Sequence, residues 1–175
     1  PIQFLQDEGY LSKIELDEIE NETDLEVNLG SDFDIPESIL KQLGKEVHRN
    51  LQVVQKCNDL IADGHKRLIV FSPSVFNSNL LAALLKTQGF ESASITSDTD
   101  LEVRAKSLNK FKDDSNETPF VLCNFGVLTT GFDAPKTSAV IIARPTTSIV
   151  LYSQMIGRAL RGVRVGGTAK ATVST

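Results

Sequence analysis

Short apolar runs alternate with amphipathic helical patterns over residues 67–143 of this 175-residue chain. The runs have the length of buried strands and are rich in β-branched and aromatic residues. They predict strands at residues 67–71, 91–97, 120–123 and 139–143. The helices predicted between them cover residues 76–88 and 100–113, and in the second helix Leu101, Leu108 and Phe111 should face inward. Strands that alternate with helices of this length require crossover connections, so the sequence predicts an α/β fold with a parallel sheet covered on both faces.

A longer helical pattern precedes the first of these strands. Apolar residues recur near 3.6-residue spacing from position 39 to 61, which predicts a helix interrupted at Gly44 and closed by Gly64. Pro36 suits the start of this helix, because its fixed φ angle matches the first helical turn. Alternating apolar residues at positions 25–29 favour a short strand further upstream.

The charge of the chain is divided unevenly along the sequence. Residues 7–37 hold twelve of the 23 acidic residues and a single base, Lys13, which gives this segment a net charge of −11. The rest of the chain therefore carries +6, since the formal net charge of the whole chain is −5. We interpret residues 1–40 as an acidic connector and residues 41–175 as the folded domain. An acidic mimic of nucleic acid is the alternative for the connector, and the basic remainder is compatible with a polyanionic partner.

Composition narrows the class of protein further. No stretch approaches the roughly 20 apolar residues that a membrane-spanning helix needs, and no signal peptide is visible. Cys57 and Cys123 lack metal-ligand spacing, which favours buried thiols in a reducing compartment, the cytoplasm. His48 and His65 have no partner motif and suit structural or surface positions. Because the first residue is Pro1 and Gly166-Gly167 could turn the tail into one more strand, we expect a piece of a longer protein.

Polar loops follow three of the predicted strands. They are Ser72-Pro73-Ser74, residues 124–135 and residues 144–148. Serine hydroxyls before a helix can cap it or donate to a phosphate, and capping is the simpler interpretation. The carboxyl ends of parallel strands share one edge of a sheet, where α/β proteins bind their ligands. We therefore expect these loops to form one working face.

The second of these loops carries several groups that suit a nucleotide. Gly131 permits a positive φ angle or a close approach of the backbone. Thr129 and Thr130 could donate to phosphates, and Asp133 could accept from a ribose hydroxyl. An ordinary turn, capped by Asp133 and stopped by Pro135, explains the same residues on local grounds alone.

The segment 154–161 carries the most specific pattern in the chain. On a helix that runs through it, Gln154, Arg158 and Arg161 stand at i, i+4 and i+7 and share one face. The apolar side chains expected on the opposite face are those of Ile149, Tyr152, Ile156, Ala159, Leu160 and Val163. Two planar guanidinium groups one turn apart suit the oxygens of a phosphate. Solvated arginines on an amphipathic surface helix are the alternative.

Taken in order, these segments resemble motifs IV, V and VI of superfamily 2 helicases, at residues 69–74, 127–135 and 154–161. Motif VI, Q-x-x-G-R-x-x-R, is matched at every defined position, and motif V matches as T-x-G-F-D-x-P. The resemblance covers residues 45–165 and is to DEAD/DEAH-box proteins related to restriction-enzyme motor subunits and excision-repair translocases. Thr130 stands where many relatives carry an acid, so no role is assigned to it.

The resemblance implies that this unit is the second of two RecA-like domains, a three-layer fold of the P-loop NTPase type. Arg158 and Arg161 would then reach the γ-phosphate of ATP held by the first domain, and Gln154 would order the nucleotide or the attacking water. Gly131 and Asp133 would face the nucleotide. Ser72, Asn124 and Thr129 would lie toward the nucleic-acid backbone. The expected nucleic acid is DNA rather than RNA.

Two motifs that ATP hydrolysis requires are absent from the sequence. There is no G-x-x-x-x-G-K-[ST] phosphate loop and no Asp-Glu-x-His box, which together would supply a lysine and a Mg²⁺ site. We therefore expect ATP and Mg²⁺ to be held mainly by a preceding domain. Residues 1–40 would connect to that domain, and this chain alone should not hydrolyse ATP.

The sequence thus predicts the carboxy-side motor domain of an ATP-dependent helicase or translocase. The first alternative is a nucleic-acid or protein-binding module that has lost motor activity, against which the intact arginines argue. The second is a nucleotide-binding enzyme of Rossmann type. That fold needs a glycine-rich turn after its first strand, which Ser72-Pro73-Ser74 does not provide.

Overall fold

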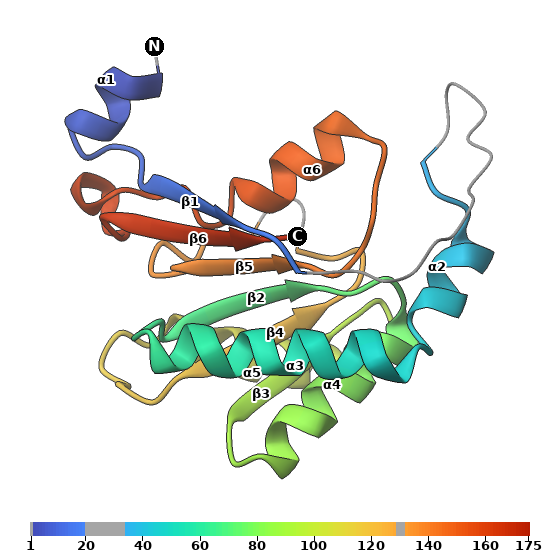
Figure 1. The fold of residues 1–175 in the computed structure, drawn as a ribbon. Coiled ribbons are helices and arrows are strands. Elements are labelled where there is room, and N and C mark those ends of the chain that lie inside the picture. Colours follow the sequence, from blue (N-terminus) through green and yellow to red (C-terminus); the bar gives the residue numbers. More distant parts are fainter. Residues whose placement is uncertain (1, 20–33, 129–131) are drawn as a thin grey trace.

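One six-stranded parallel sheet forms the centre of the molecule (Figure 1). The computed structural model describes residues 2–19, 34–128 and 132–175. The strands follow the order β1-β6-β5-β2-β4-β3 across the sheet. They are β1 (Lys13–Asp17), β2 (Arg67–Phe71), β3 (Glu91–Ile95), β4 (Phe120–Asn124), β5 (Ala139–Ile142) and β6 (Lys170–Ser174). The parallel α/β sheet predicted from the sequence is confirmed.

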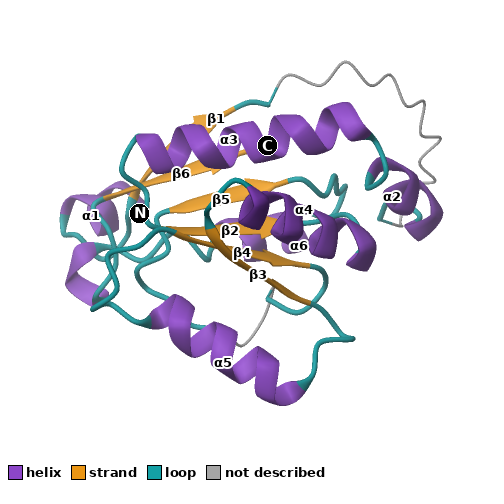
Figure 2. Cartoon of the chain, turned by 90° about the horizontal axis from the view of Figure 1, so that it is seen from below, coloured by secondary structure: helices purple, strands orange, loops and turns teal. Residues whose placement is uncertain are grey.

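Helices cover both faces of this sheet (Figure 2). They are α1 (Ile2–Asp7), α2 (Glu37–Leu43), α3 (Val47–Ala62), α4 (Val75–Thr87), α5 (Leu101–Lys112) and α6 (Ile149–Ile156), followed by the 3-10 helix η1 (Val163–Val165). The core side chains of α3 and α4 pack on one face, and those of α5 and α6 pack on the other. None of the helices within the described residues combines the length and the apolarity needed to cross a membrane.

The central strands are apolar on both faces because both faces are covered. Every residue of β2 and β4 is buried. In β2, Leu68 and Val70 pack toward α3 and α4, while Ile69 and Phe71 pack toward α5 and α6. Full burial of such a side chain contributes about 1.5–3 kcal/mol. Successive side chains of each apolar strand point to opposite faces of the sheet, so one strand packs against both layers of helices.

Both cysteines belong to this core. Cys57 on α3 and Cys123 on β4 are buried and free. Burial raises the pKa of the Cys57 thiol to about 12, and burial likewise raises the pKa of Cys123. Both thiols are therefore protonated and act as small apolar side chains, as the sequence predicted.

The helical pattern at 39–61 is divided into α2 and α3 at Gly44, as expected. Asn77 of α4 donates to the Gly44 carbonyl oxygen at 2.8 Å, and Asn50 of α3 donates to the same oxygen at 3.1 Å. A Cβ atom at Gly44 would lie 2.9 Å from Ser74 Oγ, so a larger residue has no space there. The break thus joins α2, α3 and α4. Gly64, with φ at +97°, follows the end of α3 as predicted.

The helix predicted through residue 161 is wrong in its length. The helix α6 ends at Ile156, and Gly157 caps it before a turn. The chain turns because its next residues pair with the amino-terminal segment: Ser12 N–H donates to the Leu160 carbonyl and Gly162 N–H donates to the Tyr10 carbonyl. A pattern within residues 149–163 cannot reveal this partner.

Three side chains predicted to face inward are instead exposed. Ile149 is the first residue of α6 and is 81% exposed. Val163 is the first residue of η1 and is 57% exposed. Leu101 is 77% exposed because it is the first residue of α5, directly after the Asp100 N-cap, and is too early in the helix to reach the sheet. Phe111, further along α5, is fully buried as predicted.

The strand β1 was not predicted and lies within the acidic segment. It pairs in parallel with β6, from Lys13 opposite Lys170 to Asp17 opposite Ser174. β6 follows Gly166-Gly167, where the sequence suggested one more strand. The domain boundary at residue 40 stays a prediction, and the strand proposed at 25–29 lies outside the described residues.

A buried arginine fixes the connection between α5 and β4. Arg67, at the start of β2, is 4% exposed. Its guanidinium donates five hydrogen bonds of 2.6–3.0 Å, all to main-chain carbonyl oxygens: those of Lys66, Phe111, Asp113, Asn116 and Thr118. The guanidinium therefore supplies the hydrogen bonds that main-chain N–H groups would supply to these carbonyl oxygens in a helix or strand.

We predict that Arg67→Met destabilises the domain by more than about 3 kcal/mol, because it removes all five hydrogen bonds and leaves the carbonyl oxygens of Phe111, Asn116 and Thr118 without this donor. Arg104→Met is the matched control, since the Arg104 guanidinium donates to the Thr96 carbonyl at 2.7 Å and does not bind a whole loop. Urea unfolding of both variants measures the difference. Equal losses in the two variants would contradict the role assigned to Arg67.

Candidate functional site

Two arginines from the turn after α6 meet the loop that carries Asp133. Arg161 Nη2 lies 3.2 Å from Asp133 Oδ1. Arg158 Nη1 donates to the main-chain carbonyl oxygen of Phe132. The two guanidinium groups therefore converge on one short stretch of chain, although a turn and not a continuous helix brings them there.

The backbone of Arg161 is held more firmly than its side chain. Ser12 Oγ and Thr168 N–H each donate to the Arg161 carbonyl oxygen at 2.8 Å, and Leu11 pairs with Arg161 as an antiparallel bridge. The Arg161 side chain is 49% exposed and that of Asp133 is 66% exposed. An exposed ion pair of this kind contributes about 0–1 kcal/mol, so the guanidinium can reorient at little cost.

The cluster carries excess positive charge. Burial lowers the pKa of Arg158, and the like charge of Arg161 lowers it further, while the carboxylate of Asp133 opposes both effects. Both guanidinium groups nevertheless stay charged at neutral pH. One carboxylate between two cations leaves a site that an additional anion would stabilise.

The space beside these side chains is small. It amounts to about 30 Å³ and is lined by Phe132, Asp133, Ala134, Thr137, Gly157, Arg158 and Arg161. Ligand pockets generally measure about 300–1,000 Å³. The cluster can therefore present donors to a ligand but cannot enclose a nucleotide. Gln154 stands on the last turn of α6 and is half-buried.

The arginine cluster lies at the amino edge of the sheet, which corrects the expectation of a single working face at the carboxyl edge. Thr137 lines the cleft directly before β5, and Thr168, which donates to Arg161, precedes β6. The reason is the path of the chain. The helix α6 leaves the carboxyl end of β5 and returns along the sheet, and Asp133 lies between the carboxyl end of β4 and the amino end of β5.

Ser72 and Asn124 lie at the opposite, carboxyl edge. Ser72 N–H donates to the Asn124 carbonyl at 2.8 Å, and Asn124 Nδ2 donates to the Val70 carbonyl at 3.0 Å. Both residues are buried, yet Ser72 Oγ and Asn124 Oδ1 have no hydrogen-bond partner among the described residues. Ser74 caps α4, as the simpler interpretation held.

The predicted site residues therefore divide into two groups. Arg158, Arg161 and Asp133 come together at the amino edge, and Ser72 and Asn124 come together at the carboxyl edge. A five-residue strand of about 16 Å separates the edges. Thr129 and Gly131 lie outside the described residues.

A second ionic cluster, which was not predicted from the sequence, lies at the carboxyl edge. Arg144 Nη2 donates to Asp34 Oδ2 at 3.0 Å. Thr146 Oγ1 and Thr147 N–H donate to Asp34 Oδ1 at 2.8 and 3.1 Å. Burial alone would raise the pKa of Asp34, but these hydrogen bonds and the charge of Arg144 outweigh it and lower the pKa. The polar run at 144–148 was visible in the sequence, whereas its partner lies 110 positions away.

The chain matches the helicase conserved C-terminal domain over residues 52–163. It belongs to this family. Over 96 residues the domain is 36% identical to IRC3 of Saccharomyces cerevisiae, which is named as an ATP-dependent helicase. That match covers 55% of this chain and 14% of the yeast protein.

Solved structures of superfamily 2 helicase domains share the fold. A Vibrio vulnificus fragment, described as an HsdR subunit of a type I restriction enzyme, has a TM-score of 0.69 at 22% identity, over 96% of this chain and 32% of that one. Domain 2 of the DEAD-box helicase Mss116p, solved with an RNA duplex, has a TM-score of 0.57 at 20% identity. The match covers 73% of this chain and 49% of that one. These structures confirm the RecA-like fold, and the family match over residues 52–163 confirms the resemblance to helicases.

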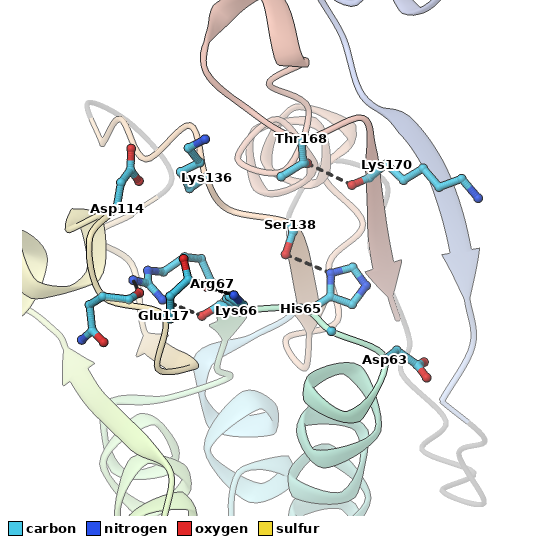
Figure 3. Close-up of a pocket in the computed structure, with 12 residues that line it drawn as sticks. Asp63, His65, Lys66, Arg67, Asp114, Glu117, Lys136, Ser138, Thr168 and Lys170 are labelled. Atoms are coloured by element: carbon cyan, nitrogen blue, oxygen red, sulfur yellow. Dashed lines mark hydrogen bonds and ion pairs between the residues drawn. The ribbon is translucent and has the colours of Figure 1, made fainter.

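A wider hollow of about 380 Å³ opens elsewhere on the amino edge of this helicase domain (Figure 3). Its charges are largely compensated within the molecule. Lys66 pairs with Glu117, Lys170 pairs with Glu15, and the donors of Arg67 serve main-chain carbonyls. The hollow is larger than the arginine cleft, but two guanidinium groups converge beside the cleft, so we place the candidate site at the arginines.

His65 sits on the wall of this hollow and joins two strands. Its Nδ1 lies 2.9 Å from Ser138 Oγ, and its Nε2 lies 3.2 Å from Thr172 Oγ1 (Figure 3 shows the first contact). Burial lowers the pKa of His65, although the carboxylates of Asp63 and Glu15 oppose the shift. The folded helicase domain therefore binds a proton at His65 less readily than the unfolded chain does.

We predict that the domain loses stability as the pH falls below about 6.5, the ordinary histidine value, and continues to lose it down to the lower folded pKa of His65. His65→Gln keeps partners for both hydroxyls and should remove this part of the pH dependence. Urea unfolding between about pH 8 and pH 5 measures it. His48→Gln, at an exposed position, is the control and should leave the pH dependence unchanged.

We further predict that Arg158→Ala destabilises the domain by about 1–2 kcal/mol, because it removes a partly buried donor from the Phe132 carbonyl. Arg161→Ala should cost less than about 0.5 kcal/mol, because the contacts of its backbone remain and its side chain is exposed. Urea unfolding of the two variants tests this asymmetry, and a reversed order would contradict it.

Proposed function

We propose that this chain is the carboxy-side motor domain of an ATP-dependent helicase or translocase, in which Arg158 and Arg161 contact the γ-phosphate of ATP bound by a preceding domain. The observation that carries the proposal is a pair of converging guanidinium groups beside a cleft of only about 30 Å³. A cleft this small cannot enclose a nucleotide, so a second surface is needed to complete the site.

The two arginines would have different tasks. Arg158, braced against the Phe132 carbonyl, is suited to a fixed position beside the phosphates. Arg161 can exchange its exposed contact with Asp133 for a phosphate oxygen when the domains close. Charge that builds up on a phosphoryl group during transfer would strengthen that contact, as an arginine finger requires.

The remaining nucleotide contacts are assigned from the helicase motifs. Gln154, one turn before Arg158, would order the nucleotide or the attacking water. Asp133, released from Arg161, would accept from the ribose, and Gly131 would allow close approach of the backbone. ATP with Mg²⁺, held mainly by the preceding domain, would supply the transferable phosphoryl group and the metal charge.

The carboxyl edge is the proposed nucleic-acid side. Ser72 and Asn124 place buried polar atoms there that have no partner among the described residues, and Thr129 follows in the same loop of the sequence. DNA is the proposed strand, because the motifs resemble those of restriction-enzyme motor subunits. The RNA duplex bound to Mss116p makes RNA the alternative. Backbone contacts of this kind carry little base information.

The whole protein's activity, its place in the cytoplasm and the inactivity of this chain alone are parts of the same proposal. The free, buried Cys57 and Cys123 are compatible with a reducing compartment. A binding module that has lost motor activity is the second candidate, and an ATPase assay of the full-length protein with added nucleic acid separates the two.

We predict that Arg161→Ala in the full-length protein lowers nucleic-acid-stimulated ATP hydrolysis by about 10³–10⁵-fold, the usual effect of removing an arginine finger. Its thermal unfolding should stay close to that of the wild type. Steady-state hydrolysis with single-stranded DNA, and in parallel with RNA, measures the change.

Arg164→Ala is the matched control for this test. Arg164 lies three residues on, is 53% exposed and pairs with Glu8 at 3.0 Å, so its loss removes the same charge without touching the cleft. It should keep near-normal turnover. Near-normal turnover in Arg161→Ala as well would overturn the assignment of the finger.

A further inference from the structure

Three donors from one loop converge on a single carboxylate at the carboxyl edge of the sheet, and this carboxylate also accepts from the neighbouring Ile35 N–H at 2.9 Å. They are the guanidinium of Arg144, the hydroxyl of Thr146 and the N–H of Thr147, and all bind Asp34 within 3.1 Å. The loop that carries the donors joins β5 to α6, and Figure 1 shows it at the same end of the molecule as the start of α2. A carboxylate from a distant segment thus fills a site made by one short loop.

The donor set is the kind that proteins use for phosphate. A guanidinium fork, a hydroxyl and a main-chain N–H are common partners of phosphate oxygens in nucleic-acid complexes. Arg144 is also held in place, because its guanidinium lies 5.5 Å from the centre of the Phe125 ring. Arg49 donates to the Ala143 carbonyl at 2.9 Å, which adds a second positive charge beside the loop.

We propose that Arg144, Thr146 and the Thr147 N–H form a binding site for a backbone phosphate of a nucleic acid, and that Asp34 occupies this site as an internal competitor. A carboxylate and a phosphodiester each carry one negative charge and present two oxygens to the donors, so one can replace the other without changing the local charge. The proposal rests on the proposed nucleic-acid function of the carboxyl edge and adds a contact and its regulation.

Exposure and charge favour a replaceable partner over a permanent one. The side chains of Arg144 and Asp34 are 19% and 26% exposed, so solvent and a phosphate can reach the pair. Asp34 also belongs to the segment 7–37 with its net charge of −11, whereas the rest of the chain carries +6. Among the acids of that segment that the structure describes, Asp34 is the one that meets this cluster of donors at the proposed nucleic-acid edge.

The test measures the affinity of the full-length protein for a fluorescein-labelled 20-nucleotide single strand, as DNA and as RNA, by anisotropy over a range of salt concentrations. Asp34→Asn removes the competing charge but keeps an acceptor for Thr146, and it should bind several-fold more tightly than the wild type. Arg144→Gln should bind more weakly. In the double variant the gain from Asp34→Asn should disappear, and the salt dependence should be shallower than in Asp34→Asn by about 0.7 in log–log slope, the amount for one phosphate on a single strand.

Glu37→Gln is the control for overall charge. Glu37 lies three residues from Asp34, is exposed and pairs with Lys41 within its own helix, so the variant changes the net charge equally without touching the donors. It should leave the affinity unchanged. An equal gain in Glu37→Gln would mean a general charge effect and would overturn the proposal.

A purely structural role for Asp34 predicts a different result: a lower melting temperature in Asp34→Asn with no gain in affinity, which would also overturn the proposal. Arg144→Gln keeps the test decisive if Asp34→Asn unfolds, because unchanged binding in Arg144→Gln excludes a phosphate contact. If the wild type hydrolyses ATP in response to nucleic acid but these variants bind alike, only this inference fails. Absence of any nucleic-acid response in the wild type would instead remove the proposed function.

Discussion

The carbonyl oxygen of Arg161 is the point at which three separate parts of the chain are joined. Ser12, just before β1, and Thr168, just before β6, both donate to it, while Arg161 itself follows α6. This junction ends the helix, aligns the two strands at one side of the sheet and fixes where the Arg158 and Arg161 side chains emerge. Because Arg161 contributes its main-chain carbonyl to the junction, its side chain is free of this structural task and contacts Asp133 instead.

Space around the junction is as restrictive as its hydrogen bonds. A Cβ atom at Gly162 would collide with the backbone of Gly9, and one at Gly167 would collide with the backbone of Arg161. The amino-terminal segment can approach residue 162 only because that residue is glycine, and the chain can fold back onto Arg161 only because residue 167 is glycine. The resulting cluster has two guanidinium groups, one carboxylate and a very small cleft, which is the form expected of half a site. Its counterpart at the carboxyl edge, Arg144 with Asp34, already contains its anion.

Much of the fold could be predicted from local pattern. The runs at β2, β4 and β5 are apolar at consecutive positions because both faces of the sheet are covered, and this alone indicates a parallel α/β sheet. The Ser74 cap of α4 and Gly64 after α3 were also visible, because each depends on neighbours in sequence. β1 was not visible, since the short, charged run at Lys13–Asp17 becomes a strand only through pairing with β6, more than 150 residues away.

For the candidate site, the sequence by itself determined which groups are available: two arginines at the spacing of motif VI, an aspartate in motif V, and family membership. The tertiary structure alone decided where they lie. It ended α6 at Ile156, placed Arg158, Arg161 and Asp133 at the amino edge, and set Asp34 against Arg144 at the carboxyl edge. The physical reason is that periodicity records contacts within one element, whereas a turn, an ion pair and the edge of a sheet depend on chain segments that meet only after folding.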